Sequence, residues 1–239
     1  MSEQSLHIES LENILSVFFS NVTHPVEAQQ SLFLRVMTSI YNQCPLDNVH
    51  PFALDDCSTA NAINQLKDCL KQQNPNCMNA LNSPLTYLLD ELICNIQQHA
   101  QVDKGYAFIA YNQLSRQVEI IVADLGITIY GSYVAAQKHL DKLGNSDAEA
   151  LNLAQSGYSV KNLPNAENRG YGISSNIKMV VEGLHGEFAT LSGNALMLHS
   201  TNKRQILALP PEIDFKGTMI IATIPEDVPA DFNLYNYTS

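Results

Sequence analysis

The chain has few basic residues and no long apolar run. Among its 239 residues, 13 are Lys or Arg and 24 are Asp or Glu, so the formal net charge is −11. This charge repels nucleic acid and anionic membranes at long range, so we expect neither as a partner. No apolar run reaches the roughly 20 residues needed to cross a membrane. A phosphorylated small ligand remains compatible, because a few backbone amides and local cations can hold a phosphate.

Signals for secretion, disulfide pairing and zinc binding are also missing. The N-terminus, MSEQSLHIES, is polar and lacks the basic-then-apolar pattern of a secretion signal. The cysteines are odd in number and none is spaced as CxxC, which predicts reduced thiols rather than disulfides or a zinc site. We therefore expect a cytoplasmic protein of one large or two small domains. The five cysteines are Cys44, Cys57, Cys69, Cys77 and Cys94.

Apolar spacing predicts that the first eighty residues are mainly helical. We interpret residues 1–79 as a helical region for partner binding or dimerisation, followed by a second domain over 80–239. A homodimer is consistent with this division. The expected elements are helices over 10–19 and from Pro25 onward, a loop over 44–57, and a helix capped by Ser58 that ends at 74–76.

A further helix is expected to begin with Ser83 as its cap and Pro84 in its first turn. Beside its apolar stripe run three polar residues spaced four apart, which places them on one face of the helix. They are Glu91, Asn95 and His99. The stripe itself consists of Leu85, Leu88, Leu89, Leu92 and Ile96.

Beyond this helix the pattern alternates between strands and helices, which predicts an α+β fold. We expect a two-layer α/β sandwich with helices on one face of a mixed sheet. The expected elements are a hairpin of strands 105–112 and 117–124, a helical passage over 135–159 interrupted by glycine, a helix over 173–184, and strands over 186–192, 204–210 and 217–225.

Four short motifs carry candidate chemistry, and each also has a plain structural interpretation. The amide oxygen of Asn95 can ligate Mg²⁺, and Glu91 can orient or deprotonate a water, although such a helix face often simply meets solvent. Asp124 and Gly126 follow a strand, where a carboxylate can accept a hydrogen bond from an exocyclic amine, but Asp and Gly also form ordinary turns.

The other two motifs lie nearer the C-terminus. The segment RGYG, with Arg169, Gly170 and Gly172, directly precedes a helix and can present backbone N–H groups to a phosphate, although many loops that enter helices contain glycine. Gly217 and Thr218 open the last strand and alone indicate no more than a strand.

Taken in order, these motifs make the chain resemble the GHKL ATP-binding superfamily, which includes gyrase B, heat-shock chaperone ATPases, histidine kinases and anti-sigma-factor serine kinases. DELICNIQQHA resembles the N box, DLGITI and RGYGI resemble the two glycine boxes, and KGTMII resembles the closing Gly-Thr. GLHGEFATLSGNA resembles another passage of the family. The resemblance covers about 80–226 and implies a Bergerat-type ATP-binding fold with ATP and Mg²⁺ as cofactors.

The resemblance also implies roles for individual residues. Asn95 would ligate Mg²⁺, and Glu91 would be the catalytic base or the acid that positions water. Asp124 would bind the adenine amine, with Gly126 against the ring and Thr218 near the adenine end. The phosphate contacts would come from Lys161, Arg169, Gly170 and Gly172. A mobile ATP lid is expected over about 130–169, and His99 is expected to have a structural or partner-facing role.

One residue departs from the family pattern, since Thr128 stands where the first glycine box usually has its second glycine. This departure argues against turnover more than against binding. We expect neither a phosphoacceptor histidine nor a following transducer domain, so stand-alone kinases of the anti-sigma-factor type are the nearest in organisation. We expect a Mg-ATP-binding regulator that switches or phosphorylates a protein partner. The alternatives are an ATPase driven by lid closure and a nucleotide-gated interaction module without turnover.

Overall fold

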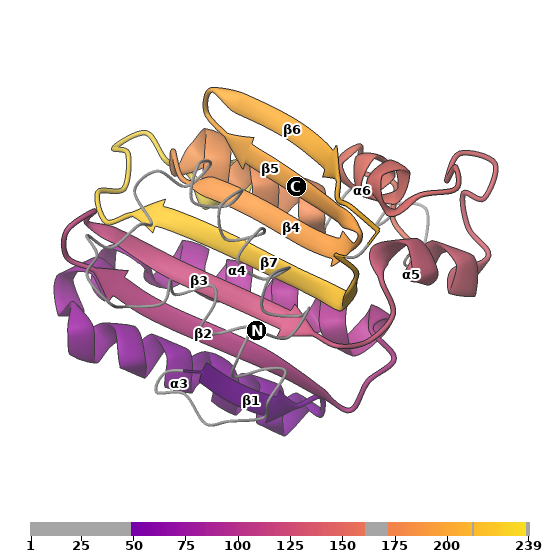
Figure 1. Cartoon of the computed structure of the whole chain (residues 1–239). Helices are drawn as coiled ribbons and strands as arrows, with labels where there is room; N and C mark the ends of the chain where they lie inside the picture. Colours follow the sequence, from indigo (N-terminus) through magenta and orange to yellow (C-terminus); the bar gives the residue numbers. More distant parts are fainter. Residues whose placement is uncertain (1–48, 161–171, 212, 238–239) are drawn as a thin grey trace, which may run out of the picture.

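The computed structural model describes residues 49–160, 172–211 and 213–237, and these form an α+β fold around a seven-stranded sheet. The strand order is β1-β2-β3-β7-β4-β5-β6 (Figure 1). The strands are β1 (Val49–Ala53), β2 (Lys104–Asn112), β3 (Gln117–Asp124), β4 (Glu187–Gly193), β5 (Ala195–Ser200), β6 (Lys203–Ala208) and β7 (Phe215–Pro225).

Every neighbouring pair of strands is antiparallel, so the prediction of a mixed sheet is wrong. The long helical connection from β3 to β4 does make these two strands parallel, as such crossovers do. However, β7 lies between them and is antiparallel to both. The last strand of the chain thus removes the one parallel contact that the order of elements led us to expect.

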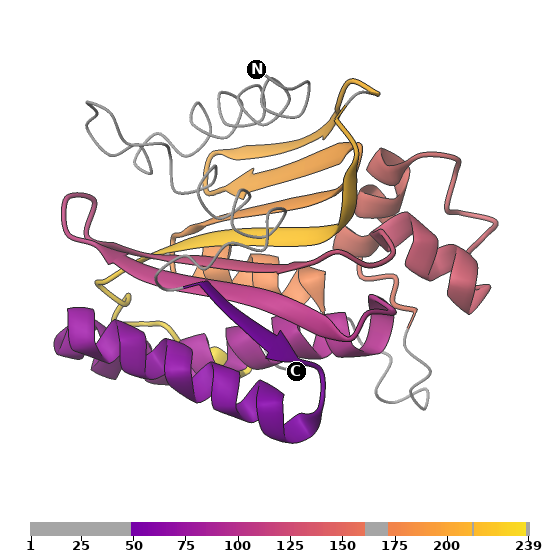
Figure 2. The same cartoon turned by 60° about the horizontal axis from the view of Figure 1, so that its bottom comes forward.

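Helices cover one face of this sheet, which gives the two-layer arrangement that was predicted (Figure 2). The core on this face joins buried residues of α3, α4, α7 and η1 to inward-facing residues of the strands, such as Ile109, Ile120 and Ala222. The helices are α3 (Asp56–Gln73), α4 (Pro75–His99), α5 (Ile129–Ala136), α6 (Asp147–Gln155), α7 (Ile173–Ile177), the π-helix η1 (Lys178–Gly183) and the 3-10 turn η2 (Leu234–Asn236).

The opposite face of the sheet carries a second apolar cluster. Because side chains alternate along a strand, the residues between those of the first core point to this side. Phe108, Ile121, Leu191 and Met219 are buried here, and no residue of a described helix belongs to the cluster. The strands are therefore apolar on both faces.

The helix α4 begins two turns earlier than the sequence predicted, at Pro75 rather than near Pro84. The side chain of Asn74 accepts a hydrogen bond from the Cys77 amide at 3.0 Å and caps the helix. Pro75 occupies the first turn, where a missing N–H costs nothing. Leu81 extends the buried stripe backward, so Pro84 lies inside the helix rather than at its start.

Two other expectations for this region are also wrong. The cap of α3 is Asp55, whose carboxylate accepts the Ser58 amide at 2.9 Å, and Ser58 lies within the helix. The expected loop over 44–57 contains β1, an edge strand that pairs with β2. Pro51 hides this strand from sequence analysis, because proline is tolerated only at edges.

The expected boundary between residues 79 and 80 falls inside α4. Both β1 and α3 belong to the same sheet and core as the later elements. Within the described part of the chain, this boundary therefore does not separate two units. The helices expected over 10–19 and after Pro25 lie outside the described residues.

Two short helices lie over 129–155, and the passage expected to be helical with a glycine interruption, 135–159, contains the second helix but only the last two residues of the first. The first, α5, begins at Ile129, and the hydroxyl of Thr128 accepts the Gly131 amide at 3.1 Å. Thr128 therefore acts as a helix N-cap at the position where the resemblance leads one to expect a second glycine. The second helix, α6, is capped by Ser146.

The remaining predictions are confirmed with small shifts in their boundaries. The β2–β3 hairpin, the helix from Ile173 and the strands β4, β6 and β7 are present. The sequence analysis missed β5, which pairs with both β4 and β6. Cys57, Cys69, Cys77 and Cys94 are reduced cysteines outside any disulfide, as expected. None of the described helices is long and apolar enough to cross a membrane.

Candidate functional site

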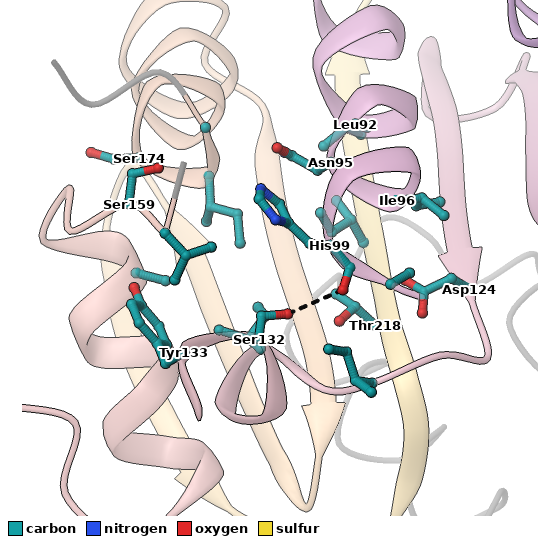
Figure 3. A pocket seen from close by; sticks show the side chains of 18 of the residues that line it. Leu92, Asn95, Ile96, His99, Asp124, Ser132, Tyr133, Ser159, Ser174 and Thr218 are labelled. Atoms are coloured by element: carbon teal, nitrogen blue, oxygen red, sulfur yellow. Dashed lines mark hydrogen bonds between the residues drawn. The ribbon is translucent and has the colours of Figure 1, made fainter. Parts of the chain in front are cut away.

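A cavity lies beside the C-terminal half of α4, where β3 ends and β7 begins (Figure 3). It is closed on the other side by α5, α6 and the start of α7. Including the part open to solvent, its volume is about 860 Å³. Its walls are mainly apolar, and a few polar side chains point into it. Those labelled in Figure 3 are Asn95, His99, Asp124, Ser132, Ser159, Ser174 and Thr218.

Asp124 is the buried carboxylate of the cavity and is 3% exposed. It lies at the end of β3, and its Oδ1 accepts a hydrogen bond from the Gly126 amide at 2.8 Å. Burial raises the pKa of Asp124 to about 6, and the backbone N–H groups of Gly126 and Thr218 oppose that shift only in part. At neutral pH the carboxylate is mostly ionised and can accept a donor from a ligand.

Gly126 is required by a close approach of two backbones. A Cβ at this position would lie 1.9 Å from the carbonyl oxygen of Ala100, at the end of α4. The same oxygen accepts the amide of Ile127 at 2.9 Å. The absence of a side chain therefore lets the β3–α5 loop dock on α4 and form one edge of the cavity.

Thr218 lies opposite Asp124 in the antiparallel register of β3 and β7, directly after Gly217. Gly217 has a φ of +113°, and a Cβ there would lie 2.2 Å from the Asp124 carbonyl oxygen. The hydroxyl of Thr218 is 3.2 Å from that of Ser192, which also accepts the Ile129 amide at 2.9 Å. The sequence analysis did not single out Ser192, a buried residue of β4 that joins β7 to the start of α5.

Two of the three polar residues on α4 line the cavity. Asn95 and His99 point into it, and the carbonyl oxygen of His99 accepts the Ser132 hydroxyl at 3.5 Å (Figure 3). Glu91, one turn earlier, is half-buried but does not line the cavity. A structural or partner-facing role was expected for His99, and the structure adds that His99 lines the cavity. Its spacing of four from Asn95 was the signal that could have revealed this.

The residues expected to contact phosphate are described only in part. Gly172 lines the cavity just before α7, with a positive φ of +155° and no atom within 4 Å of an added Cβ. Lys161, Arg169 and Gly170 lie outside the described residues.

The α5–α6 side of the cavity forms a small apolar unit of its own. Tyr133, Leu143, Ala150 and Leu153 pack together, and the Tyr133 hydroxyl donates to the Tyr158 carbonyl oxygen at 2.5 Å. Tyr133, Tyr158 and Ser159 all line the cavity. None of the three was predicted as a site residue, because each depends on how this unit folds back toward α4.

The donor atoms of the cavity are compatible with Mg²⁺ only as part of a ligand complex. The described residues contain no cluster of three or more His, Cys, Asp or Glu side chains that could hold a metal. Mg²⁺ commonly binds through one or two protein oxygens, with phosphate oxygens and waters completing its coordination. The amide of Asn95 fits such a role, since it lines the cavity and offers a hard oxygen ligand.

Comparison with known proteins identifies no relative. No family model matches the chain, and no curated protein or solved structure matches it. The functional assignment therefore depends on the geometry of the cavity and on the motifs that line it.

Proposed function

We propose that the chain is a Mg-ATP-binding regulatory protein of the GHKL type, with a Bergerat-type fold, that switches or phosphorylates a protein partner. One observation carries the proposal. Asn95, Asp124, Gly172 and Thr218 come from four separate motifs and line a single cavity. A chance collection of a helix face, two turns and a strand start has no reason to converge in this way.

The chemistry of the cavity suits a purine nucleotide. The buried carboxylate of Asp124 can accept a hydrogen bond from the exocyclic amine of adenine, and a carboxylate gives a stronger bond than a neutral acceptor. Val122, Ile96 and Ile220 provide apolar surface for a flat ring. Asn95 lies on α4, where its amide oxygen can hold a Mg²⁺ that neutralises phosphate charge.

The same geometry favours a second candidate, a nucleotide-gated interaction module without turnover. Glu91 is the candidate catalytic base, yet it does not line the cavity. Thr128 caps a helix instead of providing the glycine of a flexible hinge. In this candidate, nucleotide binding alone changes the surface presented to the partner.

Calorimetric titration of Mg-ATP into the full-length chain tests binding. We expect Asp124→Asn to weaken the affinity about tenfold or more, since it removes the charge from a buried hydrogen bond. Asn95→Ala should weaken binding only while Mg²⁺ is present, and the difference should disappear in EDTA. Asp214→Asn and Asn79→Ala change exposed residues of the same types, with Asn79 on the same helix, and should bind as the wild type does.

The proposal would be refuted if folded wild-type protein released no heat with any nucleotide. It would also be refuted if both site variants bound Mg-ATP as tightly as the wild type does. Phosphate release and phosphate transfer to a partner, compared between the wild type and Glu91→Gln, then distinguish the two candidates. Turnover lost in Glu91→Gln supports the enzyme, and binding without turnover in the wild type supports the module.

A further inference from the structure

A second cavity lies between α6, the α7–η1 helix and the outer strands β5 and β6. Its volume is about 1050 Å³ when the part open to solvent is included. Amides and hydroxyls line it, among them Gln155, Gln205 and Ser156. None of the sequence motifs contributes to it except through Ser174, which also lines the first cavity.

His199 is the buried polar side chain of this second cavity and is only 2% exposed. It lies on β5 and points to the helix-covered face, as Ala195 and Met197 do at alternating positions of the same strand. Neither ring nitrogen has a hydrogen-bond partner within the part of the chain that the structure describes. A neutral imidazole has one donor and one acceptor, and burying both without partners is unfavourable. A ligand in the cavity would provide the missing partner.

Positive charge gathers around this imidazole. Arg204 lies opposite His199 in the β5–β6 register, and Lys178 lines the cavity from η1. Glu182 is the one acidic residue among the described lining residues, and it accepts a single hydrogen bond from the Arg204 guanidinium at 2.8 Å. A guanidinium has five N–H donors, so Arg204 can bind Glu182 and a second anion together. This excess of cations is notable in a chain with a net charge of −11.

We propose that this cavity binds a small oxyanion, a phosphate or carboxylate group, through Arg204 and Lys178, with the His199 ring N–H as its buried donor. The guanidinium provides a planar pair of donors that matches either anion. This inference is independent of the proposed nucleotide site, because it depends on other residues and needs no bound nucleotide.

Anion binding should be linked to protonation of His199. Burial, followed by the charge of Arg204, lowers the pKa of His199 to about 4, so the ring is neutral at pH 7. The charged groups that line the same cavity are Lys178, Glu182 and Arg204. An anion beside the ring favours the imidazolium form and raises its pKa, so affinity should increase as the pH falls from 7 toward 5.

The test is an NMR titration of the full-length chain with labelled histidine, without nucleotide. Inorganic phosphate and, separately, acetate are added at pH 6.5 against a chloride control of equal ionic strength. We expect a saturable shift of the His199 ring signals with at least one of the two anions. The signals are assigned by their loss in His199→Gln or, if that variant does not fold, as the ring that titrates near pH 4. Whichever anion binds identifies the chemistry of the ligand.

Variants distinguish specific anion binding in this cavity from non-specific electrostatic attraction of anions to the protein. Arg204→Gln should weaken the affinity about tenfold, and Lys178→Gln should weaken it less, because a single charge without bidentate geometry is lost. Lys216→Gln changes an exposed lysine on β7 and should bind as the wild type does. The proposal is overturned if His199 shifts no more than in chloride, or if Arg204→Gln binds as tightly as Lys216→Gln.

Discussion

The two cavities share the wall formed by α6 and Ser174, yet each buries an ionisable side chain of opposite character. The first cavity is mainly apolar and contains Asp124, whose pKa is raised to about 6. The second is polar and contains His199, whose pKa is lowered to about 4. In both cases burial disfavours the charged form, so it raises the pKa of the acid and lowers that of the base.

The two cavities differ in whether the fold provides hydrogen-bond partners for the buried ionisable side chain. Backbone N–H groups hold the carboxylate of Asp124 in place before any ligand arrives. The imidazole of His199 has no such partner among the described residues. The fold therefore holds the ionisable side chain of the first cavity, whereas in our proposal a bound anion would hold that of the second.

The largest effect is expected from Gly126→Ala, which breaks the first cavity and leaves the second intact. The added Cβ would meet the Ala100 carbonyl oxygen, and backbone cannot move aside as a flexible side chain can. We expect a loss of about 3 kcal/mol or more in the free energy of unfolding, measured by chemical denaturation. Gly131→Ala within α5 is the control, because its Cβ meets Ile127 at 3.2 Å and the expected change is about 1 kcal/mol or less. Equal stability of the two variants would contradict the docking role of Gly126.

Next in size is the pH dependence that Asp124 imposes. Its folded pKa of about 6 exceeds its ordinary value of 3.8, so its stabilising contribution is complete below pH 4 and is lost as the pH rises through 6. The Asp124→Asn variant should not show this decrease in unfolding free energy, because its amide does not ionise. Relative to the wild type, the variant should gain about 2 to 3 kcal/mol of unfolding free energy between pH 4 and 7.5, since one unit of pKa corresponds to about 1.4 kcal/mol. Denaturation curves at both pH values measure this gain, and a constant difference would contradict the assignment.

The contribution of His199 to the unfolding free energy should change with pH in the opposite direction to that of Asp124, over an overlapping pH range. Its folded pKa of about 4 lies below its ordinary value of 6.5, so its contribution is complete above pH 6.5 and is lost as the pH falls through 4. Compared with His199→Gln, the wild type should lose about 2 kcal/mol of unfolding free energy between pH 7 and 4. Thermal unfolding without added phosphate checks the sign. Saturating phosphate should reduce the loss if the second cavity binds an oxyanion.

The smallest effect on stability is expected from Arg204→Gln. The ion pair of Arg204 with Glu182 joins two exposed side chains, which are 64% and 49% accessible. Exposed pairs contribute little, so the change in unfolding free energy should be about 0.5 kcal/mol or less by chemical denaturation. A variant that binds phosphate poorly while keeping its stability would assign Arg204 to the ligand, whereas a large loss of stability would assign it to the fold.

Strong local periodicity explains which parts of the fold could be predicted. The apolar stripe of α4 and the alternating runs of β2 and β3 appeared as expected. The start of α4 was misplaced because Ser83-Pro84 and Asn74-Pro75 are equally good start signals, and only the buried Leu81 decides between them. The strand β1 escaped prediction because Pro51 is acceptable only once the strand lies at an edge of the sheet.

The sequence predicted the types of residue in the candidate site, but it did not predict which of them line the cavity. Asn95, Asp124, Gly172 and Thr218 line the cavity as residues of four recognisable motifs. Glu91 and His99 both lie four residues from Asn95, so helical periodicity places both on the same face as Asn95. The axis of α4 relative to β3 and β7 places His99 in the cavity and Glu91 outside it.

The sequence by itself determined the α+β class and the segments that contain the candidate site residues, because these depend on local spacing and composition. Only the tertiary structure decided the antiparallel order of the sheet and the burial of His199. Each of these depends on contacts between segments far apart in the chain. In the most telling case, β7 inserts between β3 and β4 and brings Thr218 beside Asp124.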